Sequence, residues 1–427
     1  IGGVMNFYTT TPKLSNNKTP LLTSRSTVRY ASANNEKTAH LGFNLGFQKW
    51  GFHSSVSVSD FGDLKMGKYG PDDYLSLYYS EPLNGQDVMT PNTMPRVQKF
   101  TNFSQMHLAQ KVIYKASDDI QFDFGLHYST TSDYPRYDRL AILSDDGALK
   151  YAEWNYGPQE WLMANSQMTK HSSSSSFYDK LKISTAYQNF KESRINRRFS
   201  SEMRKIREEN VDAFSLNFDF YKLLSNNSTV SYGTEYIYNR VGSSGHKINI
   251  DTNASEAIAS RYPDGSKWQT LAAYLSHKYK PNSNVTIQSG IRYNYVTIDA
   301  DLAANNTFYD LPFKTANLDT SALTGTLGFS WNPNNTFLWK LNATTAFRAP
   351  NIDDIGKIFE SEPGLIVVPN NDLKPEYAYG GELGVTVNLK ESIIFDGSAY
   401  YTYLDNALVR KNFCLLYTSD AADDLLC

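Results

Sequence analysis

The feature that most constrains the fold of this sequence is a strict two-residue alternation of apolar and polar side chains. Within residues 285–295 the apolar side chains are Val285, Ile287, Ile291, Tyr293 and Tyr295, with polar or small ones between them. Successive side chains of a β-strand point to opposite faces, so this pattern predicts a strand with one apolar and one polar face. The pattern recurs along the chain, and no segment shows a sustained helical period.

Fifteen segments of 9–14 residues are predicted to be strands on this basis. They cover residues 24–32, 39–48, 52–60, 102–115, 119–131, 158–169, 177–190, 211–224, 227–240, 267–280, 284–297, 321–332, 336–347, 376–389 and 392–404. Strands of globular sheets are usually about 5–6 residues long, whereas about 9–11 tilted residues cross a bilayer. Large soluble barrels also have long strands, so length alone does not decide between the two.

The connections between these segments alternate in length. Short turns rich in Asn, Ser and Pro lie near residues 49–51, 117–118, 172–176, 225–226, 281–283, 333–335 and 390–391. Long connections lie at 61–101, 132–157, 191–210, 241–266, 298–320 and 348–375. Outer-membrane barrels have short periplasmic turns and long extracellular loops. The sequence therefore predicts an all-β fold, a transmembrane antiparallel β-barrel.

Composition agrees with this interpretation. Only 41% of the residues are hydrophobic and the mean hydropathy is -0.48, as expected if one parity faces lipid and the other a polar lumen. Aromatic residues make up 14% of the chain, which fits the interfacial girdles of a membrane barrel. The net charge of -3 argues against a nucleic-acid partner.

Chemical motifs of enzymes are missing from the sequence. There is no nucleophile elbow, no zinc-protease helix motif and no Gly-rich phosphate loop. Both cysteines, Cys414 and Cys427, lie in the last 14 residues, so residues 1–413 contain no disulfide or Cys-bound zinc. We expect no enzymatic activity, no cofactor and no metal site. The chain opens on Ile1 without a basic leader, and we expect it to begin inside a longer protein.

Three segments of the sequence are distinctive. Ile1–Pro12 reads "IGGVMNFYTTTP", Thr345–Ile355 reads "TAFRAPNIDDI" and Val367–Gly384 reads "VVPNNDLKPEYAYGGELG". They resemble the TonB-dependent outer-membrane receptor family, of the type found in Bacteroidetes. The first segment resembles the end of its plug domain, and the other two resemble its C-terminal barrel motifs. Similar segments lie at 128–140, 151–162 and 187–197, and the resemblance extends to about residue 412.

The resemblance implies a barrel of 22 strands closed by an N-terminal plug and energised by the TonB complex through a box near the N-terminus. We expect about 15 of these strands here, and a barrel that is not closed, with the box and nearly all of the plug missing. The expected division is a plug end at 1–12, an incomplete barrel at 13–404, the start of an extracellular loop at 405–413 and a non-native tail at 414–427. Expected partners are outer-membrane lipid, the TonB complex and a small nutrient such as a ferric siderophore.

If the plug ends in the periplasm, the long connections lie outside the cell, where a ligand binds. The candidate substrate-binding residues there are Tyr134, Arg136, Tyr137, Arg139, Trp154, Tyr156, His246, Arg348 and Asp353. Arginine and aromatic side chains at a concave mouth suit a small anionic or aromatic ligand. The alternative is that these residues pack loops against the plug and each other, and the position of Arg348 near Pro350 favours such a structural role.

The ligand class rests on a comparison with haem receptors of the family. Those receptors resemble this chain in having a "FRAP" segment and a later Asn-rich segment, with an iron-binding His between the two. Residues 351–369 contain no His here, and Asn370–Leu373 reads "NNDL". We therefore favour a ferric siderophore over haem or another nutrient. A passive porin and a soluble carbohydrate-binding β-protein remain as alternatives.

Overall fold

The structure is a computed structural model that describes residues 8–309, 314–357, 359–362, 365–367, 373–389 and 392–409. Residues 1–7 of the expected plug end at 1–12 lie outside the described residues. The expected tail at 414–427 lies wholly outside them. The loop start expected at 405–413 is described only to residue 409. The Asn-rich segment Asn370–Leu373 is described only at Leu373.

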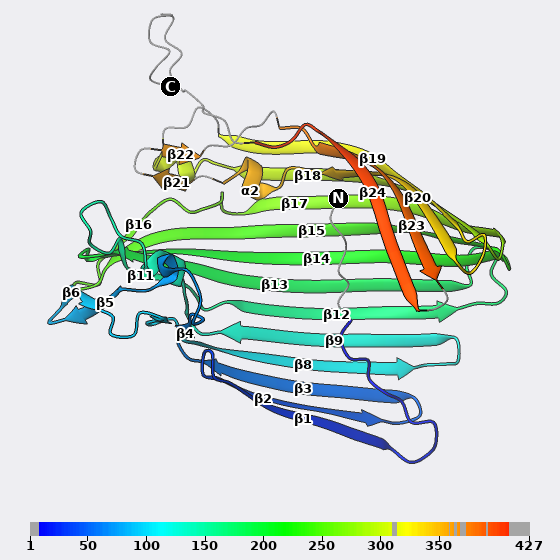
Figure 1. Cartoon of the computed structure of the whole chain (residues 1–427), viewed down its shortest axis with the longest axis horizontal. Helices are drawn as coiled ribbons and strands as arrows, with labels where there is room; N and C mark the ends of the chain where they lie inside the picture. The colour runs from blue at the N-terminus through cyan, green and yellow to red at the C-terminus, as the bar shows by residue number, and fades with distance from the viewer. Residues whose placement is uncertain are drawn as a thin grey trace, which may run out of the picture.

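In this described part, fifteen long strands pair in chain order, each antiparallel to the next (Figure 1). They are β1 (Leu21–Ala31), β2 (Glu36–Gly46), β3 (Trp50–Phe61), β8 (Phe103–Lys115), β9 (Ile120–Thr131), β12 (Glu160–His171), β13 (Lys180–Arg198), β14 (Met203–Ser225), β15 (Ser228–Asn249), β17 (Ser266–Asn282), β18 (Val285–Asp301), β19 (Thr315–Trp331), β20 (Phe337–Arg348), β23 (Glu376–Leu389) and β24 (Ile393–Asp405). Each overlaps a segment that the alternation predicted, which confirms the all-β antiparallel class. The total of 22 strands stays a prediction.

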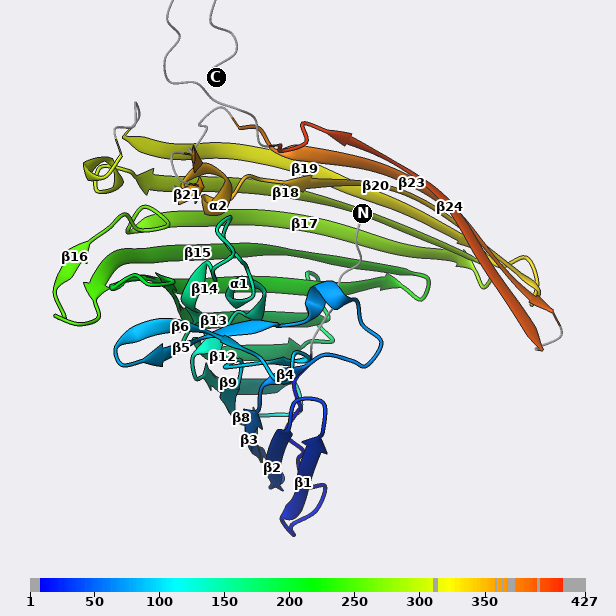
Figure 2. The ribbon, with the colours of Figure 1, turned by 60° about the vertical axis from the view of Figure 1, so that its left-hand side comes forward.

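The strands form one strongly curved sheet (Figure 2). Among the described residues, β1 pairs only with β2 along its length and β24 only with β23, so the sheet is open between these two edges. Helices in this part are limited to two four-residue α-helices, α1 (Tyr137–Leu140) and α2 (Ile352–Ile355), and two three-residue 3-10 turns. None of the helices in the described ranges is long and apolar enough to cross a membrane.

The two faces of the sheet differ as the alternation predicts. Leu41, Ile291 and Leu323 lie on one face and are 50–64% exposed. Leaving apolar area in water costs about 25 cal/mol per Å², so this face is suited to lipid, and we call it the lipid-facing face. The opposite, polar face carries side chains such as Asn44 and Asn294.

Aromatic rings gather beside the short turns. The ring of Trp50 stacks on that of Tyr114 at 4.2 Å, and Trp331 lies opposite Trp339 across β19 and β20. These positions fit the predicted aromatic girdle. Trp268, near the start of β17, does not fit it. Its parity is opposite to that of the lipid-facing Leu271, so it points to the polar face and packs beneath α2.

The connections at the other end of the strands carry the short elements. Between β3 and β8 lie β4 (Leu64–Lys65), η1 (Asp72–Tyr74), β5 (Tyr78–Leu83), β6 (Gln86–Pro91) and β7 (Val97–Gln98). Between β9 and β12 lie β10 (Tyr134–Pro135), α1 and β11 (Tyr151–Tyr156). Later connections hold β16 (Ser255–Ala257), η2 (Asn305–Thr307), α2, β21 (Phe359–Glu362) and β22 (Leu365–Val367).

One of the predicted long connections is wrong. Residues 191–210 are not a loop, because β13 and β14 stay paired to Arg197 and Arg204 and leave a turn of only residues 199–202. β15 likewise continues to Asn249, which places His246 in a strand rather than in a loop. These extensions are polar on both faces, so they lack the apolar alternation on which the prediction rests, while backbone hydrogen bonds still hold the ladder.

The N-terminal described segment crosses the polar face of β2 and β8. The Lys13 backbone N–H donates to Asn44 Oδ1 at 2.7 Å, and Lys111 Nζ donates to Thr9 Oγ1 at 2.9 Å. A Cβ atom at Gly46 would collide with the Lys13 carbonyl, so only glycine allows this close approach. The chain therefore enters the sheet from its polar side.

Candidate ligand-binding site

Most of the predicted site residues lie at the long-connection end, as expected. Tyr134 is in β10, Trp154 and Tyr156 are in β11, and Tyr137 and Arg139 are in α1. Arg348 is the last residue of β20 and Asp353 lies in α2. The structure brings only some of these side chains together.

Arg136 lies at the centre of the first group. Its guanidinium stands over the rings of Trp154 and Tyr156, at 4.8 and 5.5 Å, and its Nη1 donates to Tyr156 Oη at 3.0 Å. The same guanidinium donates to both carboxylate oxygens of Asp138 and thereby lowers the pKa of that carboxyl. Cation–π contacts of this kind contribute about 0.5–2 kcal/mol. Arg136 thus joins the start of α1 to β11 within the connection between β9 and β12.

A second group continues from Tyr156 along the extended β13–β14 hairpin. The guanidinium of Arg194 of β13 lies over the Tyr156 ring, 5.2 Å from its centre, and Arg194 Nη2 lies 3.3 Å from Glu192 Oε1. In the register of the hairpin, Glu192 faces Glu209 and Arg194 faces Arg207. Like charges directly opposite each other destabilise a sheet. Both cross-strand pairs in this hairpin therefore have the unfavourable arrangement, with like charges opposite each other.

Arg261, from the segment between β16 and β17, inserts beside the two carboxylates. Its Nη1 lies 3.5 Å from Glu192 Oε1 and 3.5 Å from Glu209 Oε2. We call Glu192, Arg194, Arg207, Glu209 and Arg261 the arginine–glutamate cluster. The Arg261 and Glu209 side chains are buried, 7% and 5% exposed. Burial raises the pKa of Glu209, and the nearby Arg261 offsets this only in part.

The cluster connects to α2 through Tyr262. The guanidinium of Arg261 stands 5.0 Å from the centre of the Tyr262 ring, and Tyr262 Oη donates to Asp353 Oδ1 at 2.6 Å. Asp353 also pairs with Lys357 Nζ at 2.8 Å. Burial acts to raise the pKa of Asp353, but the hydrogen bonds from Lys357 and Tyr262 outweigh it and the pKa is lowered. A continuous set of contacts therefore runs from Arg136 to α2.

α2 is held on the polar face by packing as well. Ile352 and Ile355 form a buried cluster with Ile298 of β18, against which Trp268 also packs. Asn351 accepts a hydrogen bond from the backbone N–H of Asp354, and the Asp354 carboxylate accepts one from the Asn351 backbone N–H, which closes a capping box.

Arg348 supports this arrangement rather than facing the cluster. Its Nη2 donates to both carboxylate oxygens of Asp354, at 2.9 and 2.7 Å, and its Nη1 lies 3.3 Å from Glu376 Oε2. These contacts fix the start of α2. They fit the structural role that the sequence favoured for Arg348.

Four other predicted residues lie outside this series of contacts or, like Arg139, at its edge. Tyr134 packs edge-on against Phe103 at 4.5 Å, while Tyr137 is exposed on α1 and Arg139 lies 3.7 Å from Asp138. His246 pairs with Ile206 and Ala257 in the strand ladder. Its parity is that of Tyr236 and Tyr238 on the lipid-facing side of β15, so it points away from the polar face.

Sequence reasoning missed the arginine–glutamate cluster and Tyr262. Residues 191–209 contain eleven charged side chains in nineteen positions, "KESRINRRFSSEMRKIREE", and that density is the signal that was available. It was interpreted as loop because the apolar alternation stops. Once the segment is a strand, alternate charges fall on opposite faces.

The other face of the same hairpin carries a second charged group. Arg197 donates to Asp87 through Nη1 and Nη2, at 2.7 and 2.8 Å, and through Nε to Glu153 at 2.9 Å. Arg204 donates to the two oxygens of Glu153 at 2.7 and 2.9 Å. We call Asp87, Glu153, Arg197 and Arg204 the Asp87 network. It fastens the β5–β6 hairpin to β13 and β14, with Arg197 and Asp87 8% and 5% exposed.

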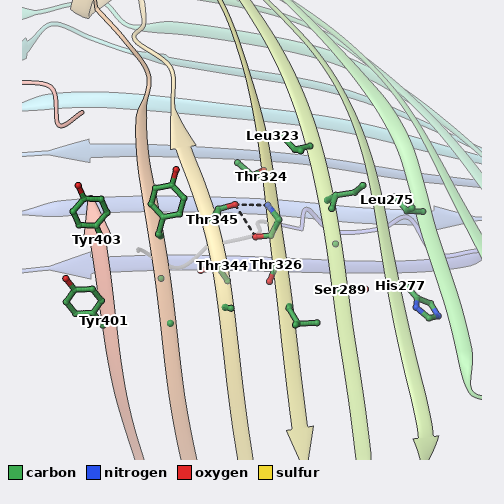
Figure 3. A pocket seen from close by; sticks show the side chains of 18 residues that line it. Leu275, His277, Ser289, Leu323, Thr324, Thr326, Thr344, Thr345, Tyr401 and Tyr403 are labelled. Carbon is green, nitrogen blue, oxygen red and sulfur yellow. Dashed lines mark hydrogen bonds between the residues drawn. The ribbon is translucent and has the colours of Figure 1, made fainter. Parts of the chain in front are cut away.

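A hollow of about 850 Å³ lies on the lipid-facing face between β17 and β24 (Figure 3). Apolar side chains such as Leu275, Ile291 and Leu323 line it. Inside it Thr345 Oγ1 accepts a hydrogen bond from the Gly325 N–H at 2.7 Å, beside the point where the β19–β20 ladder ends at Thr326 and Thr344 (Figure 3). Its apolar lining does not suit a polar nutrient.

Comparison with known proteins gives the family. The family model described as "TonB dependent receptor-like, beta-barrel" matches residues 114–418. No curated protein matches the chain in sequence. Solved structures that are similar in fold include the following three. The copper transporter OprC has a TM-score of 0.66 and 10% identity over 92% of this chain and 55% of its own. The FrpB iron transporter of Neisseria meningitidis has a TM-score of 0.62 and 12% identity over 92% and 55%.

The third structure is the hemophore receptor HasR of Serratia marcescens, solved with its hemophore HasA and heme. Its TM-score is 0.60, with 12% identity over 91% of this chain and 54% of its own. The chain thus spans about half the length of the solved structures it matches. At these identities the likeness shows the fold alone, whereas the family model covers most of the chain. The chain belongs to the β-barrel family of TonB-dependent receptors, and its place is the bacterial outer membrane.

Proposed function

We propose that this chain forms the barrel wall of a receptor that carries a scarce nutrient, a ferric siderophore in the first place, across the outer membrane with energy from the TonB complex. Family membership supports the energy source. The domain division proposed from the sequence, with a plug end at 1–12 and barrel from residue 13, agrees with the way Thr9 and Lys13 approach β8 and β2 from the polar side.

One observation supports a ligand site at the outer end of the polar face. Arg136 and Arg194 make cation–π contacts with Trp154 and Tyr156, and Arg261 makes one with Tyr262. Ion pairs of Glu192 with Arg194 and Arg261 join the two groups. Guanidinium groups and aromatic rings recognise anionic, partly planar ligands. Ferric siderophores with catecholate or carboxylate ligands have this chemistry. His246 faces away from the mouth, so it adds nothing to the haem alternative.

Iron uptake in living cells tests the proposal. The receptor carrying this sequence is expressed from its own locus, and radioactive iron uptake from ferric citrate and from a ferric tris-catecholate is measured under iron limitation. We expect uptake from at least one complex to fall to background when the receptor gene or the TonB gene is deleted. Uptake that needs the receptor but not TonB would establish the passive porin instead.

A further inference from the structure

The segment that precedes β1 contacts the polar face in two different ways. Residues 8–11 are exposed, and a solvent-exposed hydrogen bond from Lys111 Nζ to Thr9 Oγ1, at 2.9 Å, ties them to β8. Pro12 and Ser15, in contrast, are buried. The change from a loosely held to a tightly held chain therefore falls near Lys13, where the sequence predicts that the plug ends and the barrel begins.

Asn44 of β2 binds the backbone of Lys13 at two points. Its Oδ1 accepts a hydrogen bond from the Lys13 N–H at 2.7 Å, and its Nδ2 donates to the Lys13 carbonyl at 3.3 Å. This exchange resembles the pair of bonds between opposite residues of an antiparallel ladder. Because Asn44 is only 5% exposed, separating it from Lys13 breaks two bonds of a buried amide, which costs more than breaking an exposed contact.

Two glycines shape the surface beside the Lys13 carbonyl. Gly46 and Gly51 lie opposite each other in β2 and β3, and both are buried. A Cβ atom at Gly46 would overlap the Lys13 carbonyl oxygen, and one at Gly51 would lie only 3.0 Å from it. The carbonyl thus fits a slot that side chains at these positions would fill. We call Asn44, Gly46 and Gly51 the Lys13 clamp.

The chain between the clamp and β1 is folded back on itself. The Ser15 N–H donates to the Phe47 carbonyl at 3.0 Å, and Ser15 Oγ donates to the Thr19 carbonyl at 2.6 Å. The chain then enters β1 at Leu21, which pairs with Gly46 of the clamp (Figure 1). Because β1 follows the clamp in the chain, a force applied from the N-terminal side reaches the clamp first.

We propose that the Lys13 clamp is a mechanical anchor, which bears a force that pulls on the chain from its N-terminal side and keeps that force from separating β1 from β2. This inference rests on the proposed function, in which the TonB complex is the source of the force. The chain before Lys13 leaves the polar face when it is pulled, and the chain after Lys13 stays with the barrel. Without the anchor the force would act on β1 at Leu21, where the ladder with β2 begins.

Pulling on single receptor molecules tests the anchor. The full-length receptor is held in a lipid bilayer, and a handle attached at Tyr8→Cys, where Tyr8 is 89% exposed, applies a constant force from the periplasmic side. We expect a release step in which residues 13–20 extend by up to about 26–29 Å before β1 detaches. Asn44→Ala should shorten the lifetime of the state before this step by about 10-fold or more, as for the loss of two hydrogen bonds.

A second variant separates the hydrogen bonds from packing. Asn44→Asp keeps the size of the side chain but sets a carboxylate oxygen against the Lys13 carbonyl, so the lifetime should fall at least as far as in Asn44→Ala. The matched control is Asn342→Ala, on the polar face of β20, which should behave like the wild type. The anchor is refuted if both Asn44 variants keep the wild-type lifetime, or if β1 detaches before residues 13–20 are released.

Thiol labelling in iron-limited cells distinguishes the anchor from the proposed function. Pro12→Cys and Leu14→Cys report on the chain just before and just after Lys13. We expect the TonB complex to increase labelling of Pro12→Cys alone, and of both positions when Asn44→Ala is added. TonB-dependent labelling of Leu14→Cys with Asn44 intact refutes the anchor. If labelling and iron uptake are both independent of TonB while the release step still requires Asn44, the anchor stands and the proposed energy source is wrong.

Discussion

The two faces of the β13–β14 extension contain the same residue types in opposite states of pairing. On one face the Asp87 network uses the Nε, Nη1 and Nη2 atoms of Arg197 and both oxygens of Asp87 and Glu153. On the other face, the arginine–glutamate cluster sets Glu192 against Glu209 and leaves buried atoms without hydrogen-bond partners. Arg194 and Arg197 are only three residues apart, so strand parity alone assigns them to different faces.

The difference indicates different roles. A complete ion network that joins Asp87 to residues 110 positions later in the chain fixes loops in place. An incomplete one leaves buried charge poorly compensated, and groups of this kind are concentrated at functional sites. Each substitution below changes one network and leaves the other intact.

The largest effect is expected from Asp87→Asn. This change leaves Arg197 buried with only part of its compensating charge, and breaking a buried pair costs about 3–5 kcal/mol. The β5–β6 hairpin should detach, which hydrogen exchange of residues 78–91 would detect as a loss of protection. Asp73→Asn, at an exposed position in the same connection, is the control. Unchanged protection in the Asp87 variant would show that the network does not hold the hairpin.

Glu209→Gln should act in the opposite direction. The pKa of Glu209 is raised by burial, which means that the charged carboxylate is less favourable in the folded chain than in the unfolded chain. The variant should therefore stabilise the outer end of β13 and β14, and slower hydrogen exchange of the amides near Glu192 and Arg194 would report it. A destabilised variant would mean that Glu209 and Arg261 form a structural pair like Arg197 and Asp87.

Lowering the pH should change the stability of the two networks in opposite directions. A raised carboxyl pKa adds stability as the pH falls through that value toward 4.5, so the arginine–glutamate cluster gains stability in this range. Among the described residues, Arg261, Glu192 and Arg194 act on the charge of Glu209.

The Asp87 network should lose stability in acid, and should do so at a lower pH than that at which the arginine–glutamate cluster gains it. Burial of Glu153 acts to raise its pKa, but the hydrogen bonds from Arg204 and Arg197 outweigh it, so the pKa lies below 4.5. Its contribution to stability is complete above 4.5 and is lost only as the pH falls through the lowered value. Hydrogen exchange of the two regions between pH 7 and 4 tests this. A parallel loss of protection in both regions above pH 4.5 would contradict it.

The sequence predicted the lipid-facing part of this molecule well and the outer part poorly. Side chains such as Ile291 and Leu323 alternate with polar neighbours because one face meets lipid, and that requirement marks the strand in the sequence. Above the membrane, water accepts polar side chains on both faces. The paired strands around Arg194 and Glu209 therefore have no apolar signature, and their register, which decides which charges meet, depends on contacts far away in the chain.

The same limit explains the uneven result for the predicted site. Trp154 and Tyr156 were predicted because they lie in the long connection 132–157 and in a segment, 151–162, that resembles the family. Their contact with Arg194 depends on the pairing of β11 with β13, in which Tyr156 lies opposite Arg194. No local pattern encodes that pairing. His246 was misplaced for the related reason that its strand is polar and continues past the membrane.

The smallest effect is expected from Arg204→Lys, at the exposed edge of the Asp87 network. Arg204 is 39% exposed, and its fork donates to both oxygens of Glu153, a geometry that a lysine ammonium cannot reproduce. Because Arg197 still neutralises Glu153 and water reaches the site, the cost should be only about 0.5–1 kcal/mol. Hydrogen exchange of residues 78–91 should change far less than in Asp87→Asn. An equally large loss of protection would show that Arg204, rather than the buried contact between Asp87 and Arg197, holds the hairpin in place.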